Sequence, residues 1–375
     1  MPFQFNPPDG FKNKTAFPTT PASEDEFRAQ MWAPFEQVRD YINQHLPTLD
    51  TPSMGLYRNA IINGGFDIWQ RGTSFSNPAY NSYFADRWKH NGDGTLGTLT
   101  VTRQEFTPGQ TDVPGNPRYY LRYAQTVAGT GQTYRNFQQL IENAALFAGQ
   151  TVTVSFYAKA VSPVVISLRF FRNFGTGGSP SPIEAASNYA NFVLTTAWQK
   201  FTATLQISSV SGKMFGTNKD DSLMMVFGFP INSAYTIDIA QVQLCAGDVA
   251  LPFQPRSFAE ELMLCQRYYE KSYNIDTPPG TATDTGSIYG ETENGAPEAP
   301  HLDTIKFGVR KRSTPTVIIY GTGGTPNAVN DETADRSIGA GNFAMPSEMG
   351  FRMNYTLQNA TSGRRWFHYI ADAEL

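Results

Sequence analysis

The sequence predicts an all-β fold, a sandwich or a barrel, and two observations lead to that prediction. Charged residues make up 17% of the 375-residue chain and aromatic residues 13%. An average soluble domain has roughly 25% charged residues, so aromatic and uncharged polar side chains take their place here, a mixture that suits pleated sheets. From Leu56 onward, seven or more short segments alternate in character, separated by Gly, Pro, Asn and Asp. No long helical pattern alternates with them, so a parallel βαβ sheet is not expected.

Residues 1–55 are predicted to be a separate N-terminal segment. Residues 1–22 are rich in Pro, Phe and Asn and indicate extended chain. Ser23 and Glu26 then form a capping-box signature, and the apolar residues that follow have helical spacing, interrupted at Pro34. A lone amphipathic helix cannot bury its apolar stripe by itself. It must pack within its own chain or on copies of itself, and the sequence leaves both open.

Residues 56–273 are predicted to form the sandwich and a helix that closes it. In stretches such as SFYAKA and LRFFRNF, residues two apart share their character, which is the period of a strand. Trp88 and Trp198 lie in strand-like surroundings and are predicted to be core residues.

The stretch NGGFDIWQRG, residues 63–72, is predicted to open the first strand of the sandwich. Its two glycines can make a tight bend because glycine adopts positive φ at little cost. In a strand, Phe66 and Ile68 would face one way and Asp67 and Trp69 the other.

A helix is predicted over SFAEELMLCQRYYEKSY, residues 257–273, where Ser257 and Glu260 form a second capping box. Its apolar face, which makes Cys265 a packing residue, would consist of Phe258, Leu262, Cys265 and Tyr269. Residues 274–375 form the last predicted region. It begins with a Gly/Pro/Thr-rich loop over 274–300 and continues with short β-segments that either form a small sheet or extend the sandwich.

Catalytic motifs are absent from the sequence, so a non-enzymatic role is expected. None of the four histidines pairs at helical spacing with His or Cys, and no G-x-S-x-G elbow, P-loop or strand-borne G-x-G-x-x-G is present. Paired carboxylates could still serve a glycosidase; the candidates are Asp86, Asp220, Asp221, Glu142 and Asp238.

Bulk properties exclude several further classes. The net charge of −4 gives no basic field for nucleic acid. No run of about 18 apolar residues is present, so no membrane insertion is expected, and the N-terminus lacks the pattern of a signal peptide. The two cysteines, Cys245 and Cys265, are expected to be free thiols of a protein made in a reducing cytoplasm.

Glycan binding is the function that the residue types favour. Aromatic rings stack on the flat faces of sugars while amide and charged groups bind the hydroxyls. Stretches rich in both kinds are NPAYNSYFADRW, ASNYANF and TYRNFQQ. Core or inter-sheet packing is the alternative for each aromatic. The predicted glycan-binding residues are Tyr80, Tyr83, Tyr189, Arg135 and Asn188.

A series of motifs carries a family resemblance. NGGFDIWQRGTSF, FADRW, LFAGQTVTVSFYAKA, LTTAWQKFTATLQISSVSGKMFGTNKDDSL and IDIAQVQLCAGDVALPFQPRSFAEELMLCQRYYEKSY follow one another over roughly residues 57–275. The series resembles a recurrent segment of phage tail-fibre and receptor-binding virion proteins, which is similar to the jelly-roll carbohydrate-binding modules of glycoside hydrolases. The ending, FGVRKRSTPTVIIYG through WFHYIADAEL, also resembles these phage proteins.

The resemblance implies a galactose-binding-like jelly roll that binds host surface polysaccharide. It also implies a location on the virion and a homotrimer. Residues 1–55 lie outside the resemblance, but their predicted helix fits a segment that attaches the chain to other virion proteins. Related sugar-binding modules hold a structural calcium ion, and the matching positions here are Asp67 and Asp238. Calcium prefers hard oxygen ligands, to which loop carbonyls would contribute. The family has Glu where this chain has Asp67, so the shorter side chain puts the geometry in doubt.

Two further functions stay open from the sequence alone. A purely structural virion protein, such as a head fibre, a decoration protein or a tail-tip adaptor, would use the sandwich as a spacer. A polysaccharide depolymerase would need one of the carboxylate pairs, but no repeat of 20–30 residues indicates the long β-helix of a processive spike.

Overall fold

A computed structural model describes residues 59–291, 301–338, 345–357 and 360–375. The chain divides into two units, Met1–Met54 and Gly55–Leu375. The predicted N-terminal helix therefore lies outside the described residues. Within the described ranges, no helix has the length and hydropathy needed to cross a membrane.

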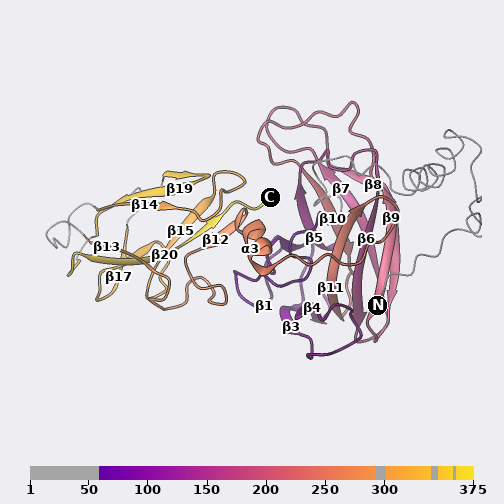
Figure 1. The fold of residues 1–375 in the computed structure, drawn as a ribbon, viewed down its shortest axis with the longest axis horizontal. Helices are drawn as coiled ribbons and strands as arrows, with labels where there is room; N and C mark the ends of the chain where they lie inside the picture. Colours follow the sequence, from indigo (N-terminus) through magenta and orange to yellow (C-terminus); the bar gives the residue numbers. More distant parts are fainter. Residues whose placement is uncertain (1–58, 292–300, 339–344, 358–359) are drawn as a thin grey trace, which may run out of the picture. The chain divides into compact units, whose positions relative to one another are not determined.

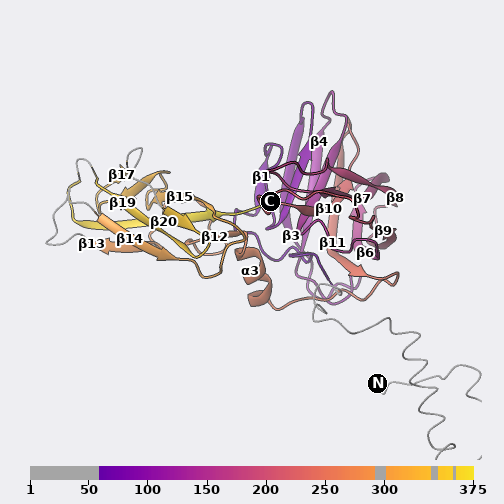
Figure 2. The same ribbon diagram turned by 90° about the horizontal axis from the view of Figure 1, so that it is seen from above.

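Two antiparallel sheets form a β-sandwich in the first part of the second unit (Figure 1, Figure 2). The six-stranded sheet has the order β1 (Ser74–Ser76), β3 (Thr98–Glu105), β4 (Tyr119–Val127), β11 (Tyr235–Ala246), β6 (Thr151–Ala160) and β9 (Gln199–Gln206). The five-stranded sheet has the order β2 (Trp88–Gly92), β5 (Arg135–Glu142), β10 (Ser222–Gly228), β7 (Val164–Asn173) and β8 (Glu184–Leu194). Most neighbouring strands come from distant parts of the sequence, as in a jelly roll, whereas β3–β4 and β7–β8 are consecutive. The all-β sandwich prediction is confirmed.

The core lies between the two sheets and is rich in aromatic rings. Along β4, Leu121 and Tyr123 are fully buried whereas their neighbours face outward, which is the period-two pattern read from the sequence. Trp88 is fully buried as predicted, and its ring stacks on Phe137 at 4.9 Å between centroids. The prediction for Trp198 is wrong. This residue precedes β9 in a turn, where its half-buried ring packs against the outward-facing rings of Phe106 and Tyr120.

The opening stretch is not a strand. Asn63 and Phe66 have φ values of 56° and 58°, so the chain turns through the left-handed region twice. Phe66, Ile68 and Trp69 are all buried, and only Asp67 is half-buried. The predicted alternation of faces therefore fails here, because two left-handed residues rotate the side chains out of the strand period.

The predicted closing helix is shorter than expected. α3 spans Phe258–Gln266, and the Ser257 hydroxyl caps it by accepting from the Glu260 amide at 3.3 Å. Cys265 is fully buried as predicted, but Phe258 is 55% exposed. The helix ends early because β12 (Tyr269–Lys271) joins another sheet, where it pairs with β20 (Arg364–Asp372).

The C-terminal β region has two sheets and a core of its own, centred on Ile319, Phe367 and Tyr369. One sheet contains β12, β20, β13 (Ile288–Glu291), β15 (Thr316–Gly321), β16 (Ala328–Asn330) and β17 (Asp335–Ser337). The other contains β14 (His301–Lys306), β19 (Gly350–Tyr355) and β18 (Met345–Ser347). The predicted C-terminal β region is therefore present, but it takes β12 from before residue 274.

Candidate functional site

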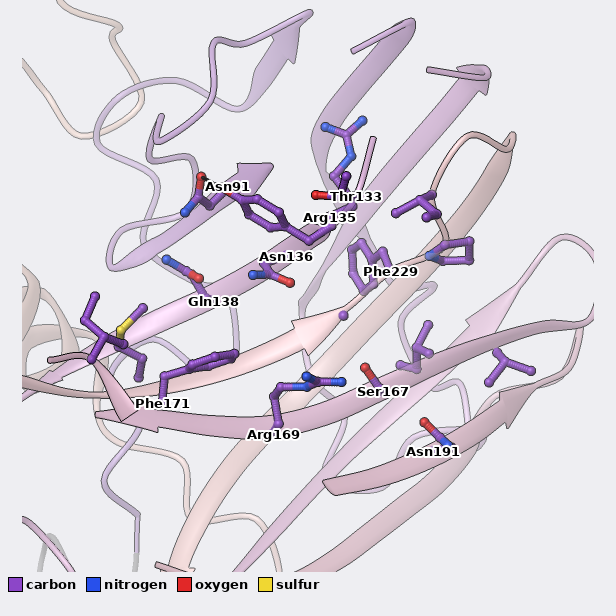
Figure 3. A pocket seen from close by; sticks show the side chains of 18 residues that line it. Asn91, Thr133, Arg135, Asn136, Gln138, Ser167, Arg169, Phe171, Asn191 and Phe229 are labelled. Carbon is purple, nitrogen blue, oxygen red and sulfur yellow. Dashed lines mark hydrogen bonds between the residues drawn. The ribbon is translucent and has the colours of Figure 1, made fainter. Parts of the chain in front are cut away.

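A cleft of about 670 Å³ lies on the outer face of the five-stranded sheet (Figure 3). Its lining comes from all five strands, from the residues just before β5 and from those just after β10. Ligand sites in proteins are typically concave surfaces of this size that combine apolar and polar groups. The cleft is therefore the candidate functional site.

The register of the strands places one row of small polar residues across the cleft. Each member is the pairing partner of the next on the neighbouring strand, so all five lie on the same face of the sheet. This amide row consists of Asn91, Asn136, Gly228, Ser167 and Asn191. At Gly228 the lack of a side chain keeps the floor open, since a Cβ there would lie 2.4 Å from the Ser167 Oγ.

Two further rows run parallel to the amide row. The adjacent row carries larger and charged groups, namely Lys89, Gln138, Val226, Arg169 and Tyr189. The next row is apolar and consists of Leu140, Met224 and Phe171. Figure 3 shows the labelled side chains of Asn136 and Gln138 on β5 pointing into the same space as those of Arg169 and Phe171 on β7.

Several polar groups of the cleft have no partner within the described residues. Gln138 is 2% exposed, and its Oε1 accepts no hydrogen bond. The described residues also offer no hydrogen-bond partner to the side chains of Asn136, Asn191 or Arg169, although all three line the cleft. A buried polar atom without a partner costs free energy, so a ligand that binds the Gln138 Oε1 gains it back. Asn136 and Arg169 are half-buried and Asn191 is exposed, so these side chains are accessible to the same ligand.

The chemistry of the cleft suits binding rather than bond cleavage. None of its 18 lining residues is Asp, Glu, His or Cys. General acid–base catalysis needs a titratable group within hydrogen-bond reach of the reacting atom, and glycoside hydrolysis usually needs two carboxyl groups. The lining instead offers amides, hydroxyls, two guanidinium groups and the rings of Tyr134, Phe171 and Phe229.

Of the predicted glycan-binding residues, Arg135 is among those that line the cleft, and Tyr189 lies on the face that carries it. The Tyr189 side chain is 57% exposed, and the Arg169 guanidinium lies 5.3 Å from its ring centroid. Tyr80 donates to the Asp93 carbonyl at 2.7 Å, and Tyr83 donates to that of Leu375 at 2.8 Å. The Tyr80 and Tyr83 hydroxyls are thus engaged within the protein.

Arg135 and Asn188 also have partners inside the protein. Arg135 is 1% exposed and donates to the Gln125 Oε1 at 2.5 Å, and Figure 3 shows its guanidinium directed away from Asn136 and Gln138. The Asn188 amide faces the backbone N and O of Gln206 at 3.0 and 3.2 Å. Glycan binding by these residues stays a prediction of the sequence.

The sequence predicted part of the cleft, because Arg135 and the stretch TYRNFQQ contribute to its lining, but it missed the lining residues of β7. Asn136 and Gln138 stand two apart in TYRNFQQ, and Ser167, Arg169 and Phe171 stand two apart in SLRFF. This spacing shows that the members of each set share a face. Whether that face points to the core or to solvent depends on how the sheets pack, and the spacing of residues does not reveal the packing.

The candidate carboxylates of a hydrolase all have partners within the protein. Asp86 is fully buried and accepts from the Gln70 amide at 3.0 Å. Glu142 forms two bonds of 2.9 Å with Arg267. The other three accept from Thr176 (Asp220), the Ala144 amide (Asp221) and Arg122 (Asp238).

The residues proposed for calcium fit that ion poorly. Asp238 accepts from Arg122 at 2.8 and 2.9 Å, and the Lys159 Nζ lies 3.9 Å away. The carbonyls of Asn59 and Ile61, which precede the opening stretch, already accept from Arg256. The described residues contain no cluster of three or more His, Cys, Asp or Glu side chains. Calcium binding stays a prediction, and the function proposed below does not depend on it.

The titration of Asp67 allows a direct test of calcium binding. Burial and the nearby Glu261 carboxylate raise the pKa of Asp67 from its ordinary 3.8 to about 6, while Arg118 and Arg103 oppose the shift. The folded state therefore holds the proton more tightly than the unfolded state. As pH rises from about 4 to about 6, ionisation of Asp67 lowers the stability of the folded state, and the loss persists at higher pH.

We expect Asp67→Asn to melt at a higher temperature than the wild type at pH 7–8 and at the same temperature below pH 4. Calorimetric melting curves across this pH range, in EDTA and in calcium chloride, measure the effect. If calcium binds Asp67, the opposite pattern follows: EDTA lowers the melting temperature of the wild type, and the variant is the less stable protein at pH 7 in calcium.

This chain is similar to proteins that bind carbohydrates. A family model described as a carbohydrate binding domain matches residues 59–221. A solved structure described as "CBM4 structure and function" is 20% identical, with a TM-score of 0.31, over 49% of this chain and 98% of that one. The TmCBM61 structure with β-1,4-galactotriose is 14% identical, with a TM-score of 0.30, over 51% of this chain and 99% of that one.

The enzymatically active domain of tailspike protein 4 from bacteriophage CBA120 is 16% identical, with a TM-score of 0.32, over 50% of this chain and 21% of that one. A search of curated proteins found no match. The family match and the two-sheet topology together support a jelly roll like that of carbohydrate-binding modules. The matched range ends before β10 and β11, which complete the two sheets.

Proposed function

We propose that this chain binds a polysaccharide non-covalently in the cleft of the five-stranded sheet and serves as the host-adhesion part of a phage virion appendage. The observation that carries glycan binding is the set of unpartnered polar groups in the cleft. A sugar presents hydroxyls that both donate and accept, so it can satisfy the amides of Asn136, Gln138 and Asn191 together. The match of residues 59–221 to a carbohydrate binding domain supports the same conclusion.

The proposed place on the virion depends on the sequence motifs. Their series from NGGFDIWQRG to the segment around α3 resembles phage tail-fibre and receptor-binding proteins, and the ending of the chain does too. In this proposal, residues 1–55 attach the chain to other virion proteins, and the assembled protein is a homotrimer. The sandwich then presents its cleft to the surface polysaccharide of the host.

The glycan-binding part is tested by measuring the affinity of the full chain for polysaccharides on an array and for polysaccharide extracted from host cells. We expect Asn136→Ala combined with Asn191→Ala to weaken binding about tenfold, since each lost hydrogen bond contributes about 0.5–1.5 kcal/mol. The matched control is Asn354→Ala, an exposed asparagine on β19.

Two results would contradict the proposal. The first is wild-type protein that binds no polysaccharide on the array and none from host cells. The second is glycan binding that the double variant leaves unchanged, which would place the site elsewhere. Immunolabelling of intact particles tests the virion location independently: antibodies to the sandwich should block adsorption, whereas a structural spacer would tolerate them.

A further inference from the structure

We infer that the cleft selects acidic polysaccharides and that Arg169 binds the carboxylate of a uronic acid unit. This inference rests on the proposed glycan-binding function and adds the chemical class of the sugar. Its basis is a guanidinium without an acidic partner, in a cleft whose lining contains no carboxylate.

Arg169 lies in the middle of the cleft-bearing face. On β7 it pairs with Val226 of β10 on one side and with Tyr189 of β8 on the other. The next outward-facing residues along β7 are Ser167 and Phe171, which also line the cleft. Figure 3 shows the Arg169 side chain between those of Phe171 and Ser167 on β7.

Among the described residues, Arg169 makes neither an ion pair nor a hydrogen bond, although its side chain is half-buried and lies against the Tyr189 ring. Other half-buried arginines of the sandwich behave differently. Arg122 pairs with Asp238 at 2.8 Å, and Arg103 pairs with Asp276 at 3.2 Å. The five donors of the Arg169 guanidinium are therefore available to a ligand, in a fork that fits a carboxylate.

The acidic residues next to the cleft are already engaged. Asp93 adjoins the lining and accepts from the Thr133 amide at 2.7 Å and from the Thr133 hydroxyl at 2.5 Å. Glu142 lies on the cleft-bearing face at the end of β5, where Arg267 holds both of its oxygens. Neither carboxylate pairs with Arg169, and neither is a lining residue.

A second cation adds to the positive character of this face. Lys89 pairs with Gln138 in the same row as Arg169. Burial and the neighbouring Arg87 lower the pKa of Lys89 to about 8, so Lys89 is mostly protonated at pH 7. The Lys89 Nζ donates to the Leu375 O atom at 3.3 Å. A neutral sugar would leave the charge of Arg169 uncompensated, whereas a uronate brings the opposite charge and the hydroxyls that the amide row requires.

The experiment measures binding of the full chain to three acidic polymers, namely polygalacturonate, alginate and hyaluronan, each beside its carboxyl-reduced neutral form. Neutral xylan, galactan and β-glucan complete the panel, and single-stranded DNA serves as a polyanion without sugar carboxylates. We expect at least one acidic polymer to bind ten times or more tighter than its reduced form, with affinity falling as sodium chloride rises.

Arg169→Gln is expected to weaken binding of that polymer about ten- to hundredfold and to remove the preference over the reduced form. Arg169→Lys should keep part of the preference, because the charge remains and the bidentate fork is lost. The control Arg352→Gln removes an exposed arginine on β19 and should change neither quantity.

The outcomes separate this inference from the function on which it rests. Binding of neutral polymers as tightly as acidic ones, or a preference that survives Arg169→Gln, overturns the inference and leaves glycan binding intact. DNA that binds as well as the acidic polymers also overturns the inference, because the cleft would then recognise negative charge alone and not a sugar carboxylate. Failure to bind any glycan of the panel or of the host overturns both.

Discussion

Replacing Gly64 by alanine is expected to lower the free energy of unfolding by about 3 kcal/mol, at the upper end of what overpacking costs. A Cβ at this position would lie 2.0 Å from the Val242 carbonyl oxygen and 3.2 Å from the Ile61 Cγ2. The obstacle is backbone, and it cannot move aside because the Gly64 carbonyl also accepts from the Val242 amide at 2.9 Å. The substitution therefore forces the opening stretch away from β11 and disturbs the core beneath it.

The matched control is Gly308→Ala. A Cβ there would meet only the Glu270 carboxylate oxygens, at 3.7 and 3.9 Å, which is ordinary van der Waals distance. We expect this variant to stay within about 0.5 kcal/mol of the wild type. Chemical denaturation measured by circular dichroism compares the two. Equal midpoints for the two variants would contradict the close approach of Gly64 to β11.

Replacing Lys311 by methionine is expected to destabilise the C-terminal β region by about 3–5 kcal/mol, the usual effect of removing one member of a buried ion pair. The Lys311 Nζ is fully buried and donates to Glu270 Oε2 at 2.5 Å, to the Gln266 carbonyl at 2.6 Å and to the Val309 carbonyl at 2.7 Å. Without it, the buried Glu270 carboxylate keeps only neutral partners, including the Tyr369 hydroxyl.

A double-mutant cycle tests this explanation. Glu270→Gln removes the charge that Lys311→Met leaves uncompensated, so the double variant should be more stable than the lysine variant alone. Calorimetry is the suitable measurement, because a chain with two cores can unfold in more than one step. If the two effects simply add, the coupling between the charges is absent and the explanation is wrong.

Much of the fold could be predicted from residue order alone. The period-two segments gave the strands of the sandwich, and the ordered motifs gave the jelly roll. Ser257 was correctly predicted to cap a helix, and Trp88 and Cys265 were correctly predicted to be buried. In each case the signal is local: a strand, a helix cap and a buried position can each be recognised from a pattern of a few neighbouring residues.

The errors arose where a contact joins distant segments. A bend at residues 63–65 and a strand after it were predicted; the bend is present, but no strand follows, and the Asn63 side chain donates to the Ile68 and Asp86 carbonyls while its backbone amide donates to Glu261. These bonds hold Asn63 in the left-handed region. The predicted helix likewise continued to residue 273, because its local pattern does not show that Tyr269 pairs with Asp372 on β20.

The sequence by itself determined that this protein is a β-sandwich whose aromatic and uncharged polar residues favour glycan binding. Alternation and composition are properties of short stretches, so the sequence shows both directly. Only the tertiary structure decided where a ligand can bind. A strand has two faces, and the same spacing of Ser167, Arg169 and Phe171 would hold if that face were buried. Packing of the six-stranded sheet against the other face leaves this one outward, and the order of strands β2, β5, β10, β7 and β8 aligns it with Asn136 and Gln138. The cleft exists because strands from separate parts of the sequence, joined by the hairpin of β7 and β8, pair in that order.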